Sequence, residues 1–119
     1  MRADRDRLED ILEAIEQIQS RMPKSRKEFD SDDMTRVWII RHLEIIGEAC
    51  RTLSPDFKAV HPEIPWRTIA DMRNILIHEY FRIDANQVWV AAAEDVPSLK
   101  AQIFQALKDT EHDDAGADL

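Results

Sequence analysis

The sequence has few of the residues that form tight turns or covalent crosslinks. Only two of its 119 residues are glycine, and its single cysteine, Cys50, excludes an internal disulfide bond. Because sheets need many turns and turns commonly use glycine, this composition favours helices joined by short loops. Cys50 lies in an apolar run, so we expect a small core residue rather than a nucleophile.

Several classes of site are missing as well. The four histidines show no paired spacing and no cysteine cluster exists, so no metal site is predicted. Glycine-rich phosphate loops and a serine-nucleophile motif are also absent. The start of the chain has no signal-peptide segment, and no stretch approaches the roughly 18 apolar residues of a membrane span. We therefore expect a cytoplasmic protein that does not contact a membrane.

The charge is unevenly distributed along the chain. The net charge is −8, but residues 109–119 hold five acidic residues and no Lys or Arg, which leaves 19 acidic against 16 basic residues in the remainder. Such a body should not bind long duplexes tightly, because that affinity comes from neutralising many phosphates, but it can carry a local basic site. We predict one helical domain over residues 1–108 and an acidic, disordered tail over 109–119.

Apolar residues recur at helical spacing over most of the chain. The pattern predicts a first helix that ends at Pro23, a charged loop over 24–30 and a second helix from Ser31 or Asp32 to about Leu53. A short helix over 56–60, a third long helix over 66–82 and a fourth from Asp84 through residue 94 follow. Pro97 starts either a new helix or a kink, and this last segment ends near residue 108. The fold class is all-α, an up-and-down bundle of four or five helices.

The second helix is apolar around more than half of its circumference. One neighbouring helix cannot cover so much apolar surface. We favour a subunit interface, so that the protein dimerises through helices. The alternative is the central helix of a monomeric bundle.

The stretch MRNILIHEYF, residues 72–81, places an arginine, an asparagine, a histidine and a tyrosine within an apolar run. At 100° per residue, Asn74 and His78 share one edge of the helix, and Arg73 and Tyr80 lie together in an apolar sector. Arg73 and His78 are about 140° apart on this wheel. A guanidinium in an apolar sector needs a partner, and Glu44 and Glu48 of the second helix are candidates.

Each candidate glutamate also has a neighbour on its own helix. We favour pairing of Glu44 with Arg41, and leave Glu48 open between Arg73 and Arg51. Taken singly, each polar residue of the motif is more typical of a structural role. Together, a histidine that exchanges protons near neutral pH and an arginine that holds phosphate oxygens suit metal-free phosphodiester chemistry.

Residues 73–80, read as Arg73-Asn74-x3-His78-x-Tyr80, resemble the motif of the HEPN superfamily, and in particular its HepT-like toxin branch. The runs IIGEA at 45–49, IPWR at 64–67 and VW at 88–89 are similar to the same branch. The resemblance covers roughly residues 5–108. It implies an all-α homodimer in which the motif helices of two subunits form a composite cleft.

The resemblance further implies a metal-independent endoribonuclease toxin without a cofactor of its own. His78 would be the acid/base, Arg73 would bind the phosphate, and Asn74 and Glu48 would support them. The product would carry a 2′,3′-cyclic phosphate. The implied partner is an MNT-type nucleotidyltransferase antitoxin, which uses ATP to transfer AMP onto Tyr80. The RNA target stays open, with transfer RNA among the candidates.

Two other functions compete with the toxin. The same dimer could be a non-catalytic module that binds a nucleotide or serves as the accessory subunit of a nucleotidyltransferase. It could also be a plain helical dimer with a buried polar network. The complete Arg73, Asn74, His78 and Tyr80 set favours the enzyme, because an adaptor has no need of His78. The wide angular separation of Arg73 and His78 can be bridged in two ways: the long Arg73 side chain wraps around the helix, or the two residues of one site come from different subunits.

Overall fold

The computed structural model describes residues 2–79 and 82–117, and this part of the chain is helical with no strand. Its elements are α1 (Arg2–Ser20), α2 (Arg26–Ser31), α3 (Asp33–Thr52), α4 (Pro55–Val60), α5 (Trp66–His78), α6 (Ala85–Val90), a π-helical segment η2 (Ala91–Asp95) and α7 (Val96–Ala117). The predicted all-α class is confirmed. No helix in the described ranges is both long and apolar enough to cross a membrane.

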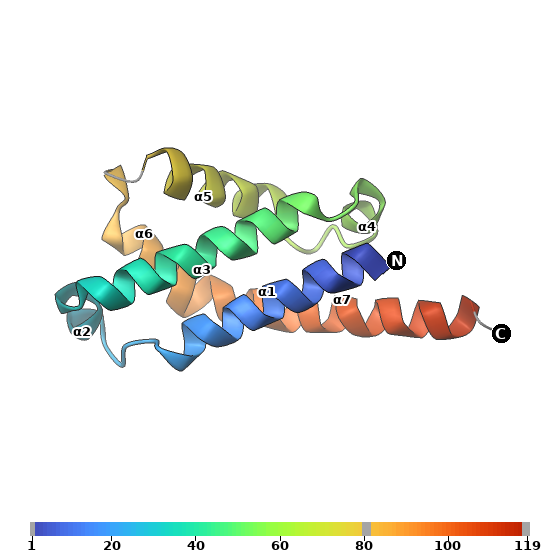
Figure 1. The fold of residues 1–119 in the computed structure, drawn as a ribbon, viewed down its shortest axis with the longest axis horizontal. Coiled ribbons are helices and arrows are strands. Elements are labelled where there is room, and N and C mark those ends of the chain that lie inside the picture. The colour runs from blue at the N-terminus through green and yellow to red at the C-terminus, as the bar shows by residue number, and fades with distance from the viewer. Residues whose placement is uncertain (1, 80–81, 118–119) are drawn as a thin grey trace.

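The long helices alternate in direction (Figure 1). α3 packs against α1 on one side and α5 on the other, and α1 also packs against α7. This is the predicted up-and-down bundle, with α5 and α7 as its outer members. The core between the helices is apolar, and its fully buried side chains are those of Leu8, Ile11, Ile15, Ile18, Phe29, Ile39 and Ile103.

The predicted loop over residues 24–30 is wrong, because α2 begins at Arg26. The Ser25 side chain accepts a hydrogen bond from the Glu28 amide, which caps this short helix. Phe29 is completely buried, and its ring lies 5.3 Å from that of Trp89. One buried aromatic anchor thus fixes a segment that its charged residues made look like a loop. The predicted cap at Asp32 is confirmed, since its side chain accepts from the Thr35 amide.

The motif helix is shorter than predicted. α5 ends at His78 rather than near Arg82, and Glu79 leaves the helical conformation while its amide still donates to the Ile75 carbonyl. The chain must turn here, because α6 starts at Ala85 with Asp84 as its cap. The helical wheel that placed Tyr80 beside Arg73 therefore does not extend to residue 80. Tyr80 itself lies outside the described residues.

The elements α6, η2 and α7 form one continuous helix. Between α6 and α7, the Val96 amide donates to the Ala91 carbonyl five residues earlier, so η2 is a π-turn inside a continuous helix. Pro97 follows immediately and brings no amide hydrogen, which agrees with a disturbed ladder rather than a new helix. The predicted end near residue 108 is wrong, because α7 continues to Ala117. Helix was thus found over 109–117 where disorder was expected, and the domain boundary at residue 108 stays a prediction.

The apolar surface of α3 is only partly buried within one chain. Leu43, Ile46 and Cys50 are buried, and burial raises the pKa of the Cys50 thiol to about 12, so its predicted role as a core residue is confirmed. Met34 and Val37, near the start of α3, remain 78% and 48% exposed. This exposed apolar pair leaves room for the subunit interface expected from the sequence.

Candidate functional site

The site is built on the contact between α3 and α5. Gly47 of α3 faces Arg73 of α5 so closely that a Cβ atom placed on Gly47 would lie 2.3 Å from the Cβ of Arg73. Any other residue at position 47 would force the two helices apart. Sequence reasoning missed this role, although a glycine inside a helix costs about 1 kcal/mol relative to alanine and so signals a packing reason.

The guanidinium of Arg73 is held by two neighbours. Its Nη2 lies 3.0 Å from Oε2 of Glu48, and its Nη1 donates to Oδ1 of Asn74 over 3.0 Å. The Nε atom is buried and has no hydrogen-bond partner. Of the two candidate carboxylates on α3, Glu48 is the one that pairs with Arg73. Because Nε is buried, a phosphate oxygen would meet this guanidinium at its terminal nitrogens rather than at Nε.

Glu48 serves two arginines at once, which settles the alternatives that the sequence left open. Arg51 donates to it through Nη2 over 2.7 Å and through Nε over 3.1 Å. The predicted pairing of Glu44 with Arg41 is confirmed at 3.5 Å. The Arg51 hydrogen bond is the main reason that the pKa of Glu48 lies below its ordinary value. Desolvation opposes it as the next largest effect, and the charges of Arg51 and Arg73 lower the pKa further.

This arrangement predicts how Glu48 titrates. Because the Arg51 hydrogen bond is the largest cause of the lowered pKa, Arg51→Ala should raise that pKa toward 4.5 more than Arg73→Ala does. Since the folded-state pKa is lowered, the ion pairs are fully formed above pH 4.5 and are lost as the pH falls through the lower folded-state value. An acid titration of the Glu48 carboxyl carbon by NMR measures this. An equal or larger shift in Arg73→Ala would contradict the assignment.

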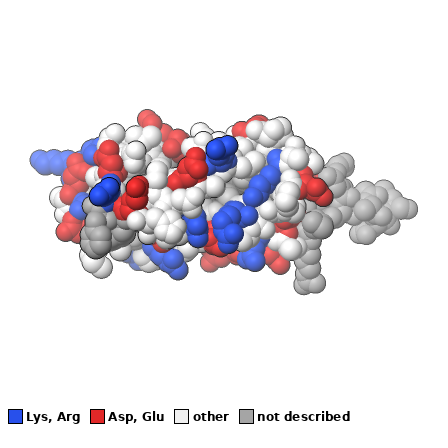
Figure 2. Space-filling model, turned by 90° about the horizontal axis from the view of Figure 1, so that it is seen from above, with Lys and Arg blue, Asp and Glu red and all other residues white. Residues whose placement is uncertain are grey.

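Arg73 lines an open groove of about 610 Å³ between α1, α3 and α5. The described residues that line it carry both signs of charge: Arg7, Asp10, Glu13, Arg41, Glu44, Glu48 and Arg73. Figure 2, which looks onto the side of α5, likewise shows basic and acidic side chains interspersed rather than one large basic field. The surface therefore suits a local contact with a phosphate better than extended contact along a nucleic acid.

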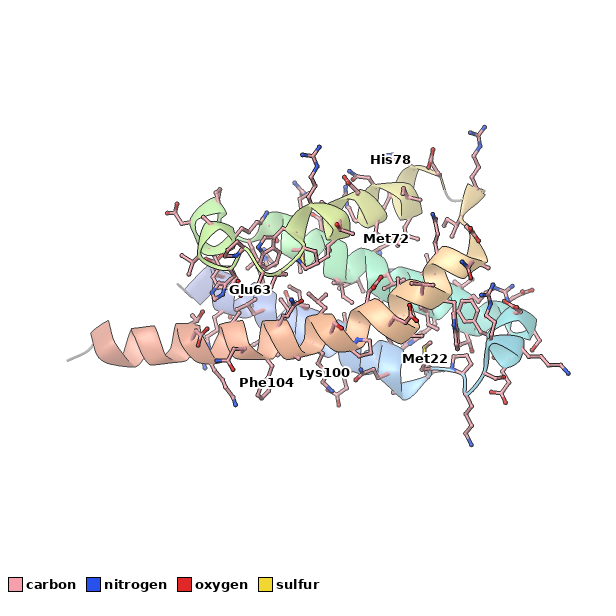
Figure 3. All side chains as sticks on the ribbon, turned by 180° about the vertical axis from the view of Figure 1, so that it is seen from behind. Met22, Glu63, Met72, His78, Lys100 and Phe104 are labelled. Atoms are coloured by element: carbon pink, nitrogen blue, oxygen red, sulfur yellow. The ribbon has the colours of Figure 1, made fainter. Side chains whose placement is uncertain are left out.

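His78 lies elsewhere on the same helix. Its side chain is exposed, it is the last residue of α5, and it is not among the residues that line the groove. Figure 3 shows it at the C-terminal end of α5, on the side of the bundle away from α7. The structure thus brings Arg73, Asn74 and Glu48 into contact, whereas His78, one turn beyond Asn74 on α5, does not line the groove. A shared site for Arg73 and His78 stays a prediction.

No group of three or more His, Cys, Asp or Glu residues in the described ranges could hold a metal ion. The donors that the site does offer are a guanidinium, an amide and a carboxylate. The guanidinium and the amide can bind a phosphate, and the carboxylate orients the guanidinium.

Comparisons with known proteins give one consistent result. A family model described as "Ribonuclease HepT-like" matches residues 11–106. The chain is 47% identical over 108 residues to a probable ribonuclease HepT of Thermococcus cleftensis, which covers 90% of this chain and 97% of that protein. No solved structure matches the chain.

Two further relatives are named as putative RNases. One, from Methanocaldococcus jannaschii, is 43% identical over 97 residues, covering 81% of this chain and 89% of the relative. Another, from Caldanaerobacter subterraneus subsp. tengcongensis, is 36% identical over 109 residues, covering 91% of this chain and 97% of the relative. In each case the similarity spans nearly the whole bundle.

Proposed function

Because the chain belongs to the HepT-like ribonuclease family, we propose that it is an endoribonuclease whose active site is completed by two subunits. The observation that carries this proposal is the angular offset of about 140° between the two motif side chains on α5. Arg73 faces the groove beside α3, whereas His78 sits exposed at the end of the same helix. A second copy related by a two-fold axis can bring the Arg73 of one subunit to the His78 of the other.

The reaction follows from the chemistry of these groups. His78 takes the proton of a ribose 2′-hydroxyl, and the resulting oxygen attacks the adjacent phosphorus. The bond from phosphorus to the 5′-oxygen breaks, and that oxygen takes up a proton from solvent as it leaves. The products are a 2′,3′-cyclic phosphate and a free 5′-hydroxyl. Arg73 stabilises the additional negative charge that develops on the phosphate oxygens in the transition state.

Glu48 and Asn74 prepare Arg73 for this role. Both already bind its terminal nitrogens, so the planar fork is held in one orientation before RNA arrives. A bound phosphate would compete with Glu48 for the terminal nitrogen Nη2. Glu48 is thus a positioning residue, and Arg51 keeps it charged and in place.

Incubation of purified protein with RNA in excess EDTA tests the proposed chemistry. We expect cleavage to persist, because a histidine and an arginine replace the metal ion, and to leave 2′,3′-cyclic phosphate ends detectable by mass spectrometry. His78→Ala is the matched control, since an exposed side chain can be removed without disturbing the core. Cleavage that stops in EDTA, or products with 5′-phosphate ends, would contradict this mechanism.

A nucleotidyltransferase of the MNT type is the proposed partner, which makes this protein the toxin of a toxin–antitoxin pair. In the proposed reaction the Tyr80 hydroxyl attacks the α-phosphorus of ATP, its proton is lost to solvent, and pyrophosphate leaves. Tyr80 lies two residues after His78 in the sequence, so the added phosphate and nucleoside would stand close to the catalytic end of α5. They would compete with RNA for Arg73 and block His78.

Intact-mass measurement of the pair incubated with ATP and Mg²⁺ tests this regulation. We expect one or more AMP additions on the wild type, loss of RNA cleavage in the modified protein, and no addition on Tyr80→Phe. That variant keeps the ring and removes only the acceptor oxygen. An unchanged mass of the wild-type chain, or modification at another residue, would contradict the assignment of Tyr80.

A further inference from the structure

A second cavity lies on the other side of α5 from the Arg73 groove. It is an apolar cleft of about 350 Å³ between α5 and the η2–α7 course, with Leu43 and Ile46 of α3 at its base. Ile69 and Met72 form its α5 wall, and Ala91 of the π-turn contributes only a methyl group opposite them. Within the described residues α5 packs along α3 but not to a comparable extent along α7, which leaves this cleft between them.

The rim of the cleft is negatively charged. Glu63 and Asp95 line it, both are exposed, and the described lining residues include no Lys or Arg. Figure 3 shows Glu63 and Met72 in the space between α5 and α7. A suitable occupant therefore combines one large apolar side chain with neighbouring positive charges.

The chain itself carries a side chain of this kind on the opposite surface. Phe104 of α7 is 50% exposed, and Lys100 and Lys108 lie one turn before and one turn after it. The Lys108 ammonium sits 4.8 Å from the Phe104 ring centre. We call Phe104 with these two lysines the α7 knob.

The α7 knob cannot reach the cleft of its own chain. Phe104 lies about 200° around the helix from Gln102, which lines the cleft. Figure 3 agrees, because Phe104 and Lys100 point away from the side of α7 that carries the cleft. The matching surfaces can therefore meet only between two copies of the chain.

We propose that the α7 knob of one copy docks into the α5–α7 cleft of a second copy. The Phe104 ring would fill the apolar interior against the thioether of Met72, a favourable sulfur–aromatic contact. Lys100 and Lys108 would face the Glu63 and Asp95 carboxylates across the rim. The contact joins two different surfaces, so it is head-to-tail and distinct from the two-fold dimer of the proposed active site. Its occupant would touch α5, the helix that carries Arg73.

Methyl NMR on mixed variants tests the contact without reference to nuclease activity. Phe104→Ala chains with ¹³C-labelled methionine methyl groups keep the cleft and lose the knob. Adding unlabelled wild-type chain should shift the Met72 methyl through the ring current of the incoming Phe104. Met22 and Met34 serve as internal references. Adding unlabelled Phe104→Ala chain should leave Met72 unchanged.

Charge variants of the labelled chain complete the test. Asp95→Lys should weaken the titration at least fivefold, whereas Glu94→Lys, its exposed neighbour in η2 outside the cleft, should not. A Met72 methyl that ignores wild-type chain, or that responds equally to Phe104→Ala chain, would overturn the proposal. A synthetic Leu/Lys helical peptide is titrated against the same labelled chain for comparison. A Met72 response to this peptide alone would assign the cleft to a different protein and would also overturn the proposal.

Discussion

Mixing inactive Arg73→Ala and His78→Ala subunits should restore roughly a quarter of the wild-type rate of RNA cleavage, if each active site takes one residue from each subunit. Random exchange makes half of the dimers mixed. Each mixed dimer has one site with both wild-type groups and one site with neither. The expectation rests on the placement of Arg73 in the groove and of His78 outside it.

Each variant alone should be nearly inactive. Loss of a general acid/base costs about 10²–10⁴-fold, and loss of a charge-stabilising group costs about 10²–10³-fold. Cleavage of a fluorescent RNA before and after subunit exchange by mild denaturation and refolding measures the recovery. The Arg73→Ala/His78→Ala double variant, mixed with the wild type, is the matched control and should give no gain.

An active site within one subunit predicts a different outcome. Both single variants would then stay inactive after mixing, because no chain in the mixture carries both groups. Circular dichroism of each variant confirms that a lack of recovery is not caused by unfolding. Persistent inactivity of folded, exchanged subunits would rule out the composite site and leave the family membership untouched.

Gly47→Ala should lower both stability and activity, although alanine is the better helix former. The new methyl carbon would lie 2.3 Å from the Arg73 Cβ and 2.7 Å from its Cγ. Such overpacking costs about 1–3 kcal/mol, against a gain of about 1 kcal/mol in helix propensity. We expect a net loss of up to about 2 kcal/mol, seen as a fall of roughly 4 °C in melting temperature per kcal/mol. Displacement of Arg73 should reduce RNA cleavage by about 10–100-fold.

A second substitution separates the close contact from other causes. Arg73→Gly removes the Cβ that the alanine would meet, so the Gly47→Ala/Arg73→Gly double variant should be more stable than the sum of the single effects predicts. Thermal melts of the four proteins give this coupling energy. A Gly47→Ala protein as stable as the wild type, or strictly additive effects, would show that α3 and α5 tolerate a wider separation.

The sequence by itself determined the all-helical class, the alternating direction of the long helices and the position of most helix starts. Apolar spacing and scarce glycine exclude most other folds, and caps such as Asp32 and Asp84 act locally, within one turn of the residue that provides them. Burial of Cys50 and the need of Arg73 for a polar partner followed in the same way, from the cost of exposing or burying a single group.

Only the tertiary structure decided the features that depend on contacts between distant segments. The sequence cannot show that Phe29 is held by Trp89, that Gly47 lets α5 approach α3, or that Glu48 binds two arginines. The early end of α5 and the π-turn before Pro97 likewise reflect where the chain must turn and pack, rather than local preference. Local rules operate over one helical turn, whereas these contacts join residues that only the folded bundle brings together.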